Sequence, residues 1–243
     1  MRDGGQAANP AVAERLERVR AEIREACREA GRDPAEVCLV AVSKAQPLER
    51  IEAALRAGQR VFGENYVQEA KRRWPALREA YPDVELHLIG ALQTNKARDA
   101  VRLFDVIQTI DRPRIAEALA REMDRLGLRR PVFLEVNLGE EPQKAGVTPE
   151  ALPALLRLCR EQLELPVLGL MAIPPLGEEV APYAALLAKL AREHGLEKVS
   201  VGMSGDFPTA IRFGATHVRV GTAIFGPRPE RGPREPGPGQ EGG

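Results

Sequence analysis

Eight short apolar runs, each followed by a helical pattern or by the last part of the chain, constrain the fold of this sequence more than any other feature. The runs are CLVAVS, RVFGEN, ELHLIGA, DVIQTI, PVFLEVNL, PVLGLMAI, KVSVGMS and HVRVGTAIFG. Their apolar character is mostly continuous rather than alternating, which is typical of parallel strands covered by helices on both faces. Eight such units predict an α/β fold, a single (β/α)8 TIM barrel.

A doubly wound open sheet is the main alternative to the barrel. Against it, AVSK continues directly into AQPLER, without the GxGxxG fingerprint that marks a dinucleotide site in such sheets. No segment between residues 35 and 226 has the composition of a linker. We therefore expect one domain.

The expected barrel domain spans residues 10–226 and begins with an extra helix. Residues 10–30 place apolar side chains three and four positions apart: Val12, Leu16, Val19, Ile23 and Cys27. The helix is expected to end at Gly31. Residues 1–9 are expected to form a flexible N-terminus. Residues 227–243 are nearly all Pro, Gly, Arg and Glu, so they cannot bury enough apolar surface to offset their ordering entropy, and we predict a disordered tail.

Charge and cysteine content narrow the function classes. Lys and Arg number 35, as do Asp and Glu, so bulk charge gives no argument for a nucleic-acid or membrane partner. The three cysteines form no CxxC pair, which suggests neither a zinc site nor a disulfide framework and fits a reducing cytoplasm. No apolar run reaches the roughly 18 residues of a membrane span, and MRDGGQAANP lacks the apolar centre of a signal peptide. We expect a soluble cytoplasmic protein that handles a small molecule and holds no metal.

Lys44 is a candidate for covalent chemistry because it closes the first apolar run. The active sites of TIM barrels lie at the C-terminal ends of the strands. Of the six lysines in the sequence, only Lys44 closes such a run. A desolvated lysine amine can lose its proton and condense with an aldehyde to form a Schiff base, whereas arginine stays protonated. The alternative is a lysine that simply reaches solvent at a strand end.

The second and third runs also carry polar groups. Glu64 and Asn65 close FGEN, and His87 lies within ELHLIGA. Asn65 is either a turn residue or an amide that orients a ligand. For Glu64, the alternative to a role in a site is that its side chain caps the following helix. An isolated His87 is more often a buried, hydrogen-bonded strand residue than an acid or a base.

The last two runs predict an anion site. VGMSGD places Ser204 at a strand-to-helix turn, and VRVGTAIFG places Gly221 and Thr222 within the eighth run. Small residues let backbone N–H groups approach an anion, and a phosphate site after strands seven and eight recurs in TIM barrels. For each glycine alone, a turn or bulge is the alternative. Lys44 and a phosphate site together suggest a phosphorylated aldehyde such as pyridoxal 5′-phosphate (PLP).

The motifs LVAVSK, VFGENYVQEA, LHLIGALQTNK, GLMAIPP, VGMSGDFPTAI and VRVGTAIFG resemble, in this order, those of the PLP homeostasis protein family. That family is similar to the barrel domain of alanine racemase (fold type III), and the resemblance covers residues 10 to 226. It implies six cofactor contacts: the internal aldimine on Lys44, phosphate contacts from Ser204 and the backbone of Gly221 and Thr222, Arg219 at the pyridine nitrogen, and Asn65 near the cofactor. The residue before His87 is Leu86 where the family often has an aromatic, so the role of His87 stays open.

The resemblance implies a protein that stores, buffers or delivers PLP without turnover, so no catalytic residue is assigned. A PLP-dependent racemase or a related fold type III enzyme is the alternative. A Schiff-base aldolase acting on a sugar phosphate would use the same lysine and phosphate logic without PLP. In the racemase, a tyrosine from a separate C-terminal domain supplies the second base, and this chain passes from AIFG into its low-complexity tail. We therefore expect no racemase activity. Whether PLP-dependent apoenzymes are partners of this protein stays open.

Overall fold

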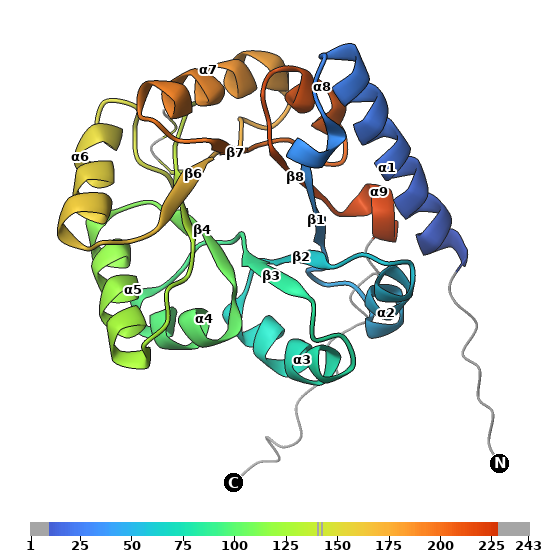
Figure 1. Ribbon diagram of the computed structural model, residues 1–243, viewed down its shortest axis with the longest axis horizontal. Helices are drawn as coiled ribbons and strands as arrows, with labels where there is room; N and C mark the ends of the chain where they lie inside the picture. Colours follow the sequence, from blue (N-terminus) through green and yellow to red (C-terminus); the bar gives the residue numbers. More distant parts are fainter. Residues whose placement is uncertain (1–9, 140, 142, 228–243) are drawn as a thin grey trace, which may run out of the picture.

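Eight parallel strands close a barrel in which each strand pairs with its neighbours in sequence and β8 pairs back to β1 (Figure 1). The computed structural model describes residues 10–139, 141 and 143–227. The strands are β1 (Cys38–Val42), β2 (Val61–Glu64), β3 (Glu85–Leu88), β4 (Val106–Ile110), β5 (Val132–Glu135), β6 (Val167–Met171), β7 (Lys198–Ser200) and β8 (His217–Val220). The closed barrel confirms the TIM-barrel prediction and excludes the doubly wound open sheet.

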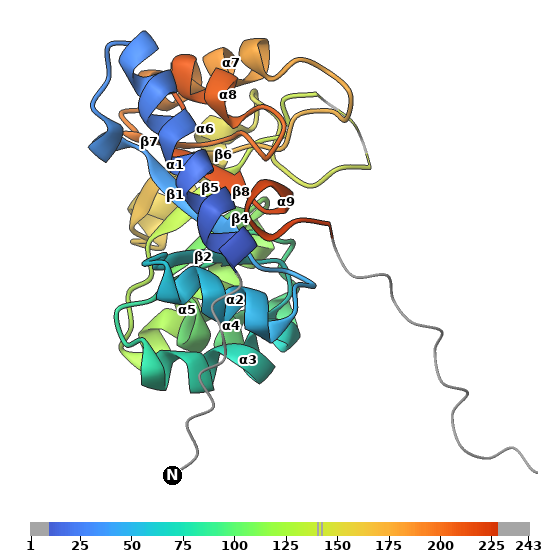
Figure 2. The same cartoon turned by 90° about the vertical axis from the view of Figure 1, so that its right-hand side faces the viewer.

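Helices surround the barrel (Figure 1). They are α1 (Pro10–Glu29), α2 (Leu48–Arg56), α3 (Val67–Ala80), α4 (Ala97–Leu103), α5 (Pro113–Leu126), α6 (Leu152–Arg157), α7 (Val180–Glu193), α8 (Phe207–Arg212) and α9 (Thr222–Phe225). Short helical segments are η1 (Pro34–Glu36), η2 (Thr94–Lys96) and η3 (Leu158–Gln162), the last a π-helix. The loops after β5 and β6 project from the same side of the barrel as α9 (Figure 2). The expected flexible N-terminus, and the expected disordered tail apart from Pro227, lie outside the described residues.

The expected extra helix is α1, which packs on the outside of the barrel against α2, α8 and α9. Its apolar stripe is buried, with Val12 and Leu16 fully so. Gly31 follows the helix with φ 64°, a left-handed conformation that glycine adopts without a steric penalty. The α1 helix therefore covers the outer face of the barrel where its first and last strands meet.

The eighth apolar run is a shorter strand than the sequence predicts. Strand β8 ends at Val220, and the N–H groups of Ile224 and Phe225 donate to the Gly221 carbonyl at 3.0 and 2.9 Å. The letters TAIF therefore form helix α9, and Gly221 and Thr222 lie beyond the strand rather than within it. The side chains of Ile224 and Phe225 are fully buried, so an apolar run can belong to a buried helix as well as to a strand.

The barrel interior differs from the main hydrophobic core between strands and helices. Inside the barrel, Val106, Phe133 and Met171 form a small apolar cluster of their own. Buried polar side chains share the interior, among them His87 and Arg219. TIM-barrel interiors are usually dominated by branched apolar residues. The polar groups here therefore need internal partners, because a buried polar group without a hydrogen bond is costly.

In the part of the chain that the structure describes, the helices are all too short or too polar to cross a membrane. The same residues contain no group of three or more His, Cys, Asp or Glu side chains that could hold a metal ion. Cys27, Cys38 and Cys159 are free thiols, and burial raises the pKa of Cys38 and of Cys159 to about 12. These two thiols therefore stay protonated at neutral pH.

Candidate functional site

A cavity of about 250 Å³ lies at the C-terminal ends of the barrel strands. All six candidate residues line it: Lys44, Asn65, Ser204, Arg219, Gly221 and Thr222. Apolar side chains, among them Val42 and Ile89, line much of the remaining wall. A neighbouring cavity of about 710 Å³ shares Lys44 and Asn65 with the first. Residues from both ends of the sequence therefore meet in one place.

Lys44 lies in a turn two residues beyond β1, rather than at the last position of the strand. The next residue, Ala45, has φ 56°, a left-handed conformation that costs an L-residue about 1 kcal/mol. Two side chains of α3 hold this strained turn. Glu69 Oε1 accepts the N–H of Ala45 at 2.9 Å, and Arg73 Nη1 donates to the Gln46 carbonyl at 2.8 Å. Sequence reasoning missed both, because nothing in α3 indicates that it packs on this turn.

Glu64 does not face the cavity, although it closes the run FGEN beside Asn65. It is fully buried, and its Oε1 accepts hydrogen bonds from Ser43 Oγ at 2.7 Å and Trp74 Nε1 at 3.1 Å. Burial raises the pKa of this carboxyl, against the opposing effect of Arg73. Successive side chains of a strand point to opposite faces, so Glu64 points outward and ties the end of β1 to α3.

Asn65 is held in the cavity wall by a close approach between β2 and β3. A Cβ atom on Gly90 would lie 2.2 Å from the Asn65 carbonyl oxygen, so only glycine fits at position 90. The side-chain Oδ1 of Asn65 is buried and has no hydrogen-bond partner among the described residues. A buried acceptor without a partner is unusual in proteins, and here it belongs to a residue that lines a cavity.

Ser204 lies in the predicted turn between β7 and α8. Its Oγ accepts the backbone N–H groups of Gly221 at 3.1 Å and Ala223 at 3.3 Å. Gly202 makes the turn possible, since its φ is 101° and a Cβ there would lie 2.7 Å from the Ala210 Cβ. One hydroxyl and two backbone N–H groups therefore gather at one point, an arrangement suited to an anion.

Arg219 is a buried cation beside the cavity, with 4 % of its surface exposed. Its Nη1 donates to Ser200 Oγ at 2.6 Å, and its Nη2 donates to the Ala172 carbonyl at 2.8 Å. Burial lowers the pKa of Arg219 to about 10, while the carboxylates of Glu135 and Asp206 act in the opposite direction. The guanidinium therefore keeps its charge at neutral pH.

Glu135 is a titratable residue at this end of the barrel that sequence reasoning missed. It is the last residue of β5 and is 6 % exposed. Burial, together with the nearby Asp111, raises the pKa of Glu135 to about 7, and the attraction of Arg219 only partly offsets this. The signal available in the sequence was a glutamate inside the apolar run PVFLEVNL.

Replacing Glu135 by Gln should change how stability depends on pH. The folded protein retains the Glu135 proton up to a pKa of about 7, whereas the unfolded chain loses it near the ordinary glutamate pKa of 4.5. The contribution of protonated Glu135 to the free energy of unfolding is therefore fully present below about pH 4.5. It is lost as the pH rises through about 7. The loss is on the order of 1 to 3 kcal/mol.

Thermal unfolding between pH 4 and pH 9 measures this effect. We expect Glu135→Gln to have a higher Tm than the wild type at pH 8 and a similar Tm at pH 4. Glu161→Gln, at an exposed position of η3, serves as the control and should follow the wild type. Parallel pH profiles for Glu135→Gln and the wild type would contradict the assignment.

Comparisons with known proteins support the relationship that the sequence motifs indicated. Residues 15–229 match the family model described as "Alanine racemase, N-terminal domain". The chain is 42% identical over 222 residues to the pyridoxal phosphate homeostasis protein of Pseudomonas aeruginosa, covering 89% of this chain and 96% of that protein. It is 40% identical over 224 residues to the protein of the same name from Aquifex aeolicus, covering 88% and 97%.

A solved structure agrees with the sequence comparisons. PipY of Synechococcus elongatus, determined with PLP bound, matches this fold with a TM-score of 0.76 at 40% identity, covering 88% of this chain and 100% of that chain. The chain belongs to the alanine racemase N-terminal domain family and, within it, to the pyridoxal phosphate homeostasis proteins.

Proposed function

We propose that this protein binds PLP and takes part in PLP homeostasis inside the cell, by storing, buffering or delivering the cofactor. One observation carries the proposal. The amine of Lys44, the candidate anion site at Ser204 and the buried cation Arg219 line a single cavity. PLP presents three matching groups, namely an aldehyde, a phosphate and a pyridine nitrogen. The relatives' shared name and the PLP in the PipY structure support the same proposal.

The residues present fit PLP chemically. Ser204 Oγ accepts the N–H groups of Gly221 and Ala223 and keeps its own proton to donate to the phosphate, and the backbone of Gly221 and Thr222 would complete the phosphate site. Hydrogen bonds to a charged group are stronger than neutral ones. Thr222 lines the same wall. Asn65, whose buried Oδ1 has no hydrogen-bond partner among the described residues, lines the same cavity. A sugar-phosphate aldolase would use the same lysine, but none of the similarities described above favours that alternative.

Lys44 would hold the cofactor covalently. Bound PLP supplies an aldehyde carbon that forms a C=N bond with a lysine amine, the Schiff base, and releases one water. The amine must be uncharged to attack the aldehyde carbon. Arg219, Val42 and Ile89 line the cavity together with Lys44. The strained turn at Ala45 fixes the backbone that carries this side chain.

Borohydride treatment of protein incubated with PLP should place a stable label on Lys44. The reagent reduces the C=N bond to a secondary amine, which peptide mapping by mass spectrometry locates. Lys44→Ala should lose the label and keep its far-UV circular dichroism spectrum, because a rim side chain contributes little core packing. Lys96→Ala is the matched control and should be labelled like the wild type. A label on Lys96 or Lys144, with Lys44 unmodified, would overturn the assignment.

Ser204→Ala should weaken PLP binding by on the order of 1.5 to 3 kcal/mol, the contribution of one hydrogen bond to a charged group. Pyridoxal, which has no phosphate, should bind far more weakly than PLP to the wild type. Its affinity should respond little to Ser204→Ala, so it serves as the internal control. Titrations followed by visible absorbance give all four dissociation constants. Equal wild-type affinities for the two aldehydes would exclude the phosphate site.

We further propose that binding occurs without turnover. Racemisation needs proton transfer on both faces of an α-carbon, so it needs two bases. Among the described residues that line the 250 Å³ cavity, Lys44 and Arg219 are the titratable ones, and a guanidinium does not act as a base in proteins. A cation at the pyridine nitrogen would also disfavour its protonation and make the cofactor a weaker electron sink. The relatives' name, a homeostasis protein, points the same way.

Chiral analysis of L-alanine and other L-amino acids after incubation with the PLP-loaded protein tests this proposal. We expect at most traces of D-amino acid, far below an ordinary kcat of roughly 1 to 10³ s⁻¹. Tyr66 lines the larger neighbouring cavity with Lys44, so Tyr66→Phe shows whether any trace depends on it as a second base. Racemisation at an ordinary enzymatic rate would favour the alternative, a PLP-dependent racemase.

We propose that the protein acts in the cytoplasm. Its three cysteines are free thiols, as is usual in a reducing compartment. Transfer of PLP to apoenzymes is one form that delivery would take. Tyr66, Ile173 and Met203, which line the two cavities, are large exposed side chains that such a recipient would meet first.

A further inference from the structure

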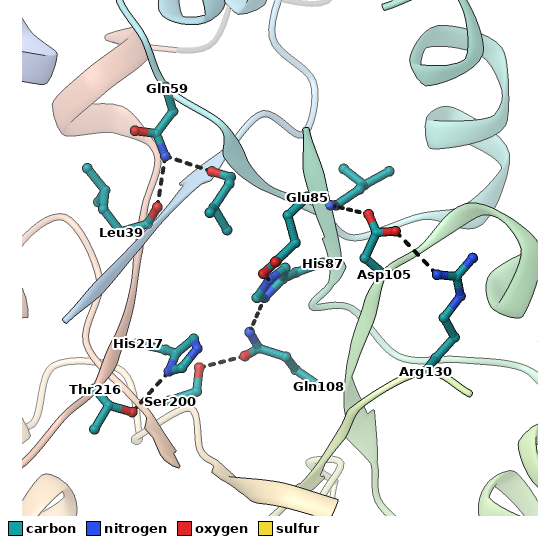
Figure 3. A network of polar contacts seen from close by, with 12 residues as sticks. Leu39, Gln59, Glu85, His87, Asp105, Gln108, Arg130, Ser200, Thr216 and His217 are labelled. Atoms are coloured by element: carbon teal, nitrogen blue, oxygen red, sulfur yellow. Dashed lines mark hydrogen bonds and ion pairs between the residues drawn. The ribbon is translucent and has the colours of Figure 1, made fainter. Parts of the chain in front are cut away.

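Five side chains form a continuous series of hydrogen bonds across the barrel interior, which we call the barrel network. Arg219 Nη1 donates to Ser200 Oγ at 2.6 Å, and Ser200 Oγ donates to Gln108 Oε1 at 2.5 Å. Gln108 Nε2 lies 2.7 Å from His87 Nδ1, and His87 Nε2 lies 2.6 Å from Glu85 Oε1. Figure 3 shows the last four residues and the contacts that join them.

The barrel network connects the candidate site with the opposite end of the barrel. Arg219 borders the cavity at the C-terminal ends of the strands, whereas Glu85 is the first residue of β3 and is about half exposed. Between them, the side chains of Ser200, Gln108 and His87 are fully buried. Four different strands contribute these residues, and apart from the contact between His87 and Glu85 within β3, each contact joins two strands.

The hydrogen bonds of the network run in one direction. Because Ser200 Oγ accepts from Arg219, its single proton is donated to the carbonyl oxygen of Gln108. The amide nitrogen of Gln108 is then a donor, so His87 Nδ1 accepts. The His87 proton is therefore on Nε2, which donates to Glu85. The permanent charge of Arg219 at one end and a carboxylate at the other give the series its direction.

The groups around His87 keep the Glu85 end of the barrel network anionic. The bond from His87 lowers the pKa of Glu85, so the carboxylate is ionised at neutral pH. The ring of His217 lies 6.1 Å from that of His87, and burial with the neighbouring His87 and Lys198 lowers the pKa of His217 to about 3, so it stays neutral. Cys38, at the start of β1, stays protonated as a thiol, since burial raises its pKa to about 12.

We propose that Ser200 and Gln108 are positioning residues for the cofactor, with His87 and Glu85 as their anchor. The barrel network holds the Arg219 guanidinium in one orientation and so sets the environment of the pyridine nitrogen of bound PLP. Among the described residues, Arg219 has one other hydrogen-bond acceptor, the Ala172 carbonyl, so loss of the network leaves a single bond to fix the orientation of the guanidinium. Only the step from Arg219 to PLP rests on the proposed function.

The network itself is tested without cofactor. In ¹⁵N NMR spectra of the PLP-free protein at neutral pH, the His87 imidazole should show an unprotonated Nδ1 and a protonated Nε2. Gln108→Met, which keeps the side-chain length but removes both hydrogen bonds, should change the Nδ1 signal. Glu85→Gln, at a half-exposed position that tolerates substitution, should shift the Nε2 signal. A protonated Nδ1 in the wild type would overturn the direction of the network, whatever PLP does.

The effect on the cofactor is tested with ¹⁵N-labelled PLP. Ser200→Ala and Gln108→Met should shift the pyridine nitrogen signal of the bound cofactor and weaken PLP binding about three- to tenfold, the effect of one lost hydrogen bond. Ser200→Thr keeps the hydroxyl and should retain the wild-type signal. Thr109→Val is the matched control, because Thr109 adjoins Gln108 in β4 and its buried hydroxyl has no partner among the described residues.

The outcomes separate this inference from the proposed function. If the wild type binds PLP, but Ser200→Ala, Gln108→Met and Glu85→Gln all keep the wild-type pyridine signal and affinity, the positioning role is wrong and the proposed function stands. If the wild type does not bind PLP, the proposed function and the positioning role both fail. The His87 spectrum then still decides whether the network exists.

Discussion

The pairing of β8 with β1 is the interaction on which the site depends. Four residue pairs, from Cys38 opposite His217 to Ala41 opposite Val220, join the first strand to the last and close the barrel. This pairing brings the turn of Lys44 next to Gly221, whose Cβ, if it had one, would lie 3.3 Å from the Val42 carbonyl oxygen. The Lys44 amine follows the first strand and the candidate anion site at Ser204 and Gly221 lies beside the last. They become neighbours only because the sheet closes.

The cost of a charged barrel interior explains several features around the site. A guanidinium removed from water needs hydrogen-bond acceptors and compensating charge. Ser200 Oγ and the Ala172 carbonyl accept its hydrogen bonds, and Glu135 provides a nearby carboxyl whose pKa burial raises to about 7. A network that is fully hydrogen-bonded in one direction rigidifies its members. The interior of this barrel therefore serves the site as well as the stability of the fold.

Much of the fold was predictable because it depends on short-range patterns. Continuous apolar runs between helical repeats indicated all eight strands, and the spacing from Val12 to Cys27 indicated α1. The exception, TAIF after Gly221, is apolar in either structure, so composition could not separate a buried helix from a strand. That Lys44 and Ser204 line one cavity was predictable, because barrel geometry places strand ends at one rim.

The sequence by itself determined the order of strands and helices, the rim position of Lys44, and the family motifs that pointed to PLP. Only the tertiary structure decided which side chains touch. It turned Glu64 away from the cavity, brought Glu69 and Arg73 onto the Lys44 turn, and joined His87, Gln108 and Ser200 to Arg219. The physical reason is that these contacts link residues on different strands and helices, and their geometry exists only once the barrel closes and side-chain direction along each strand is set.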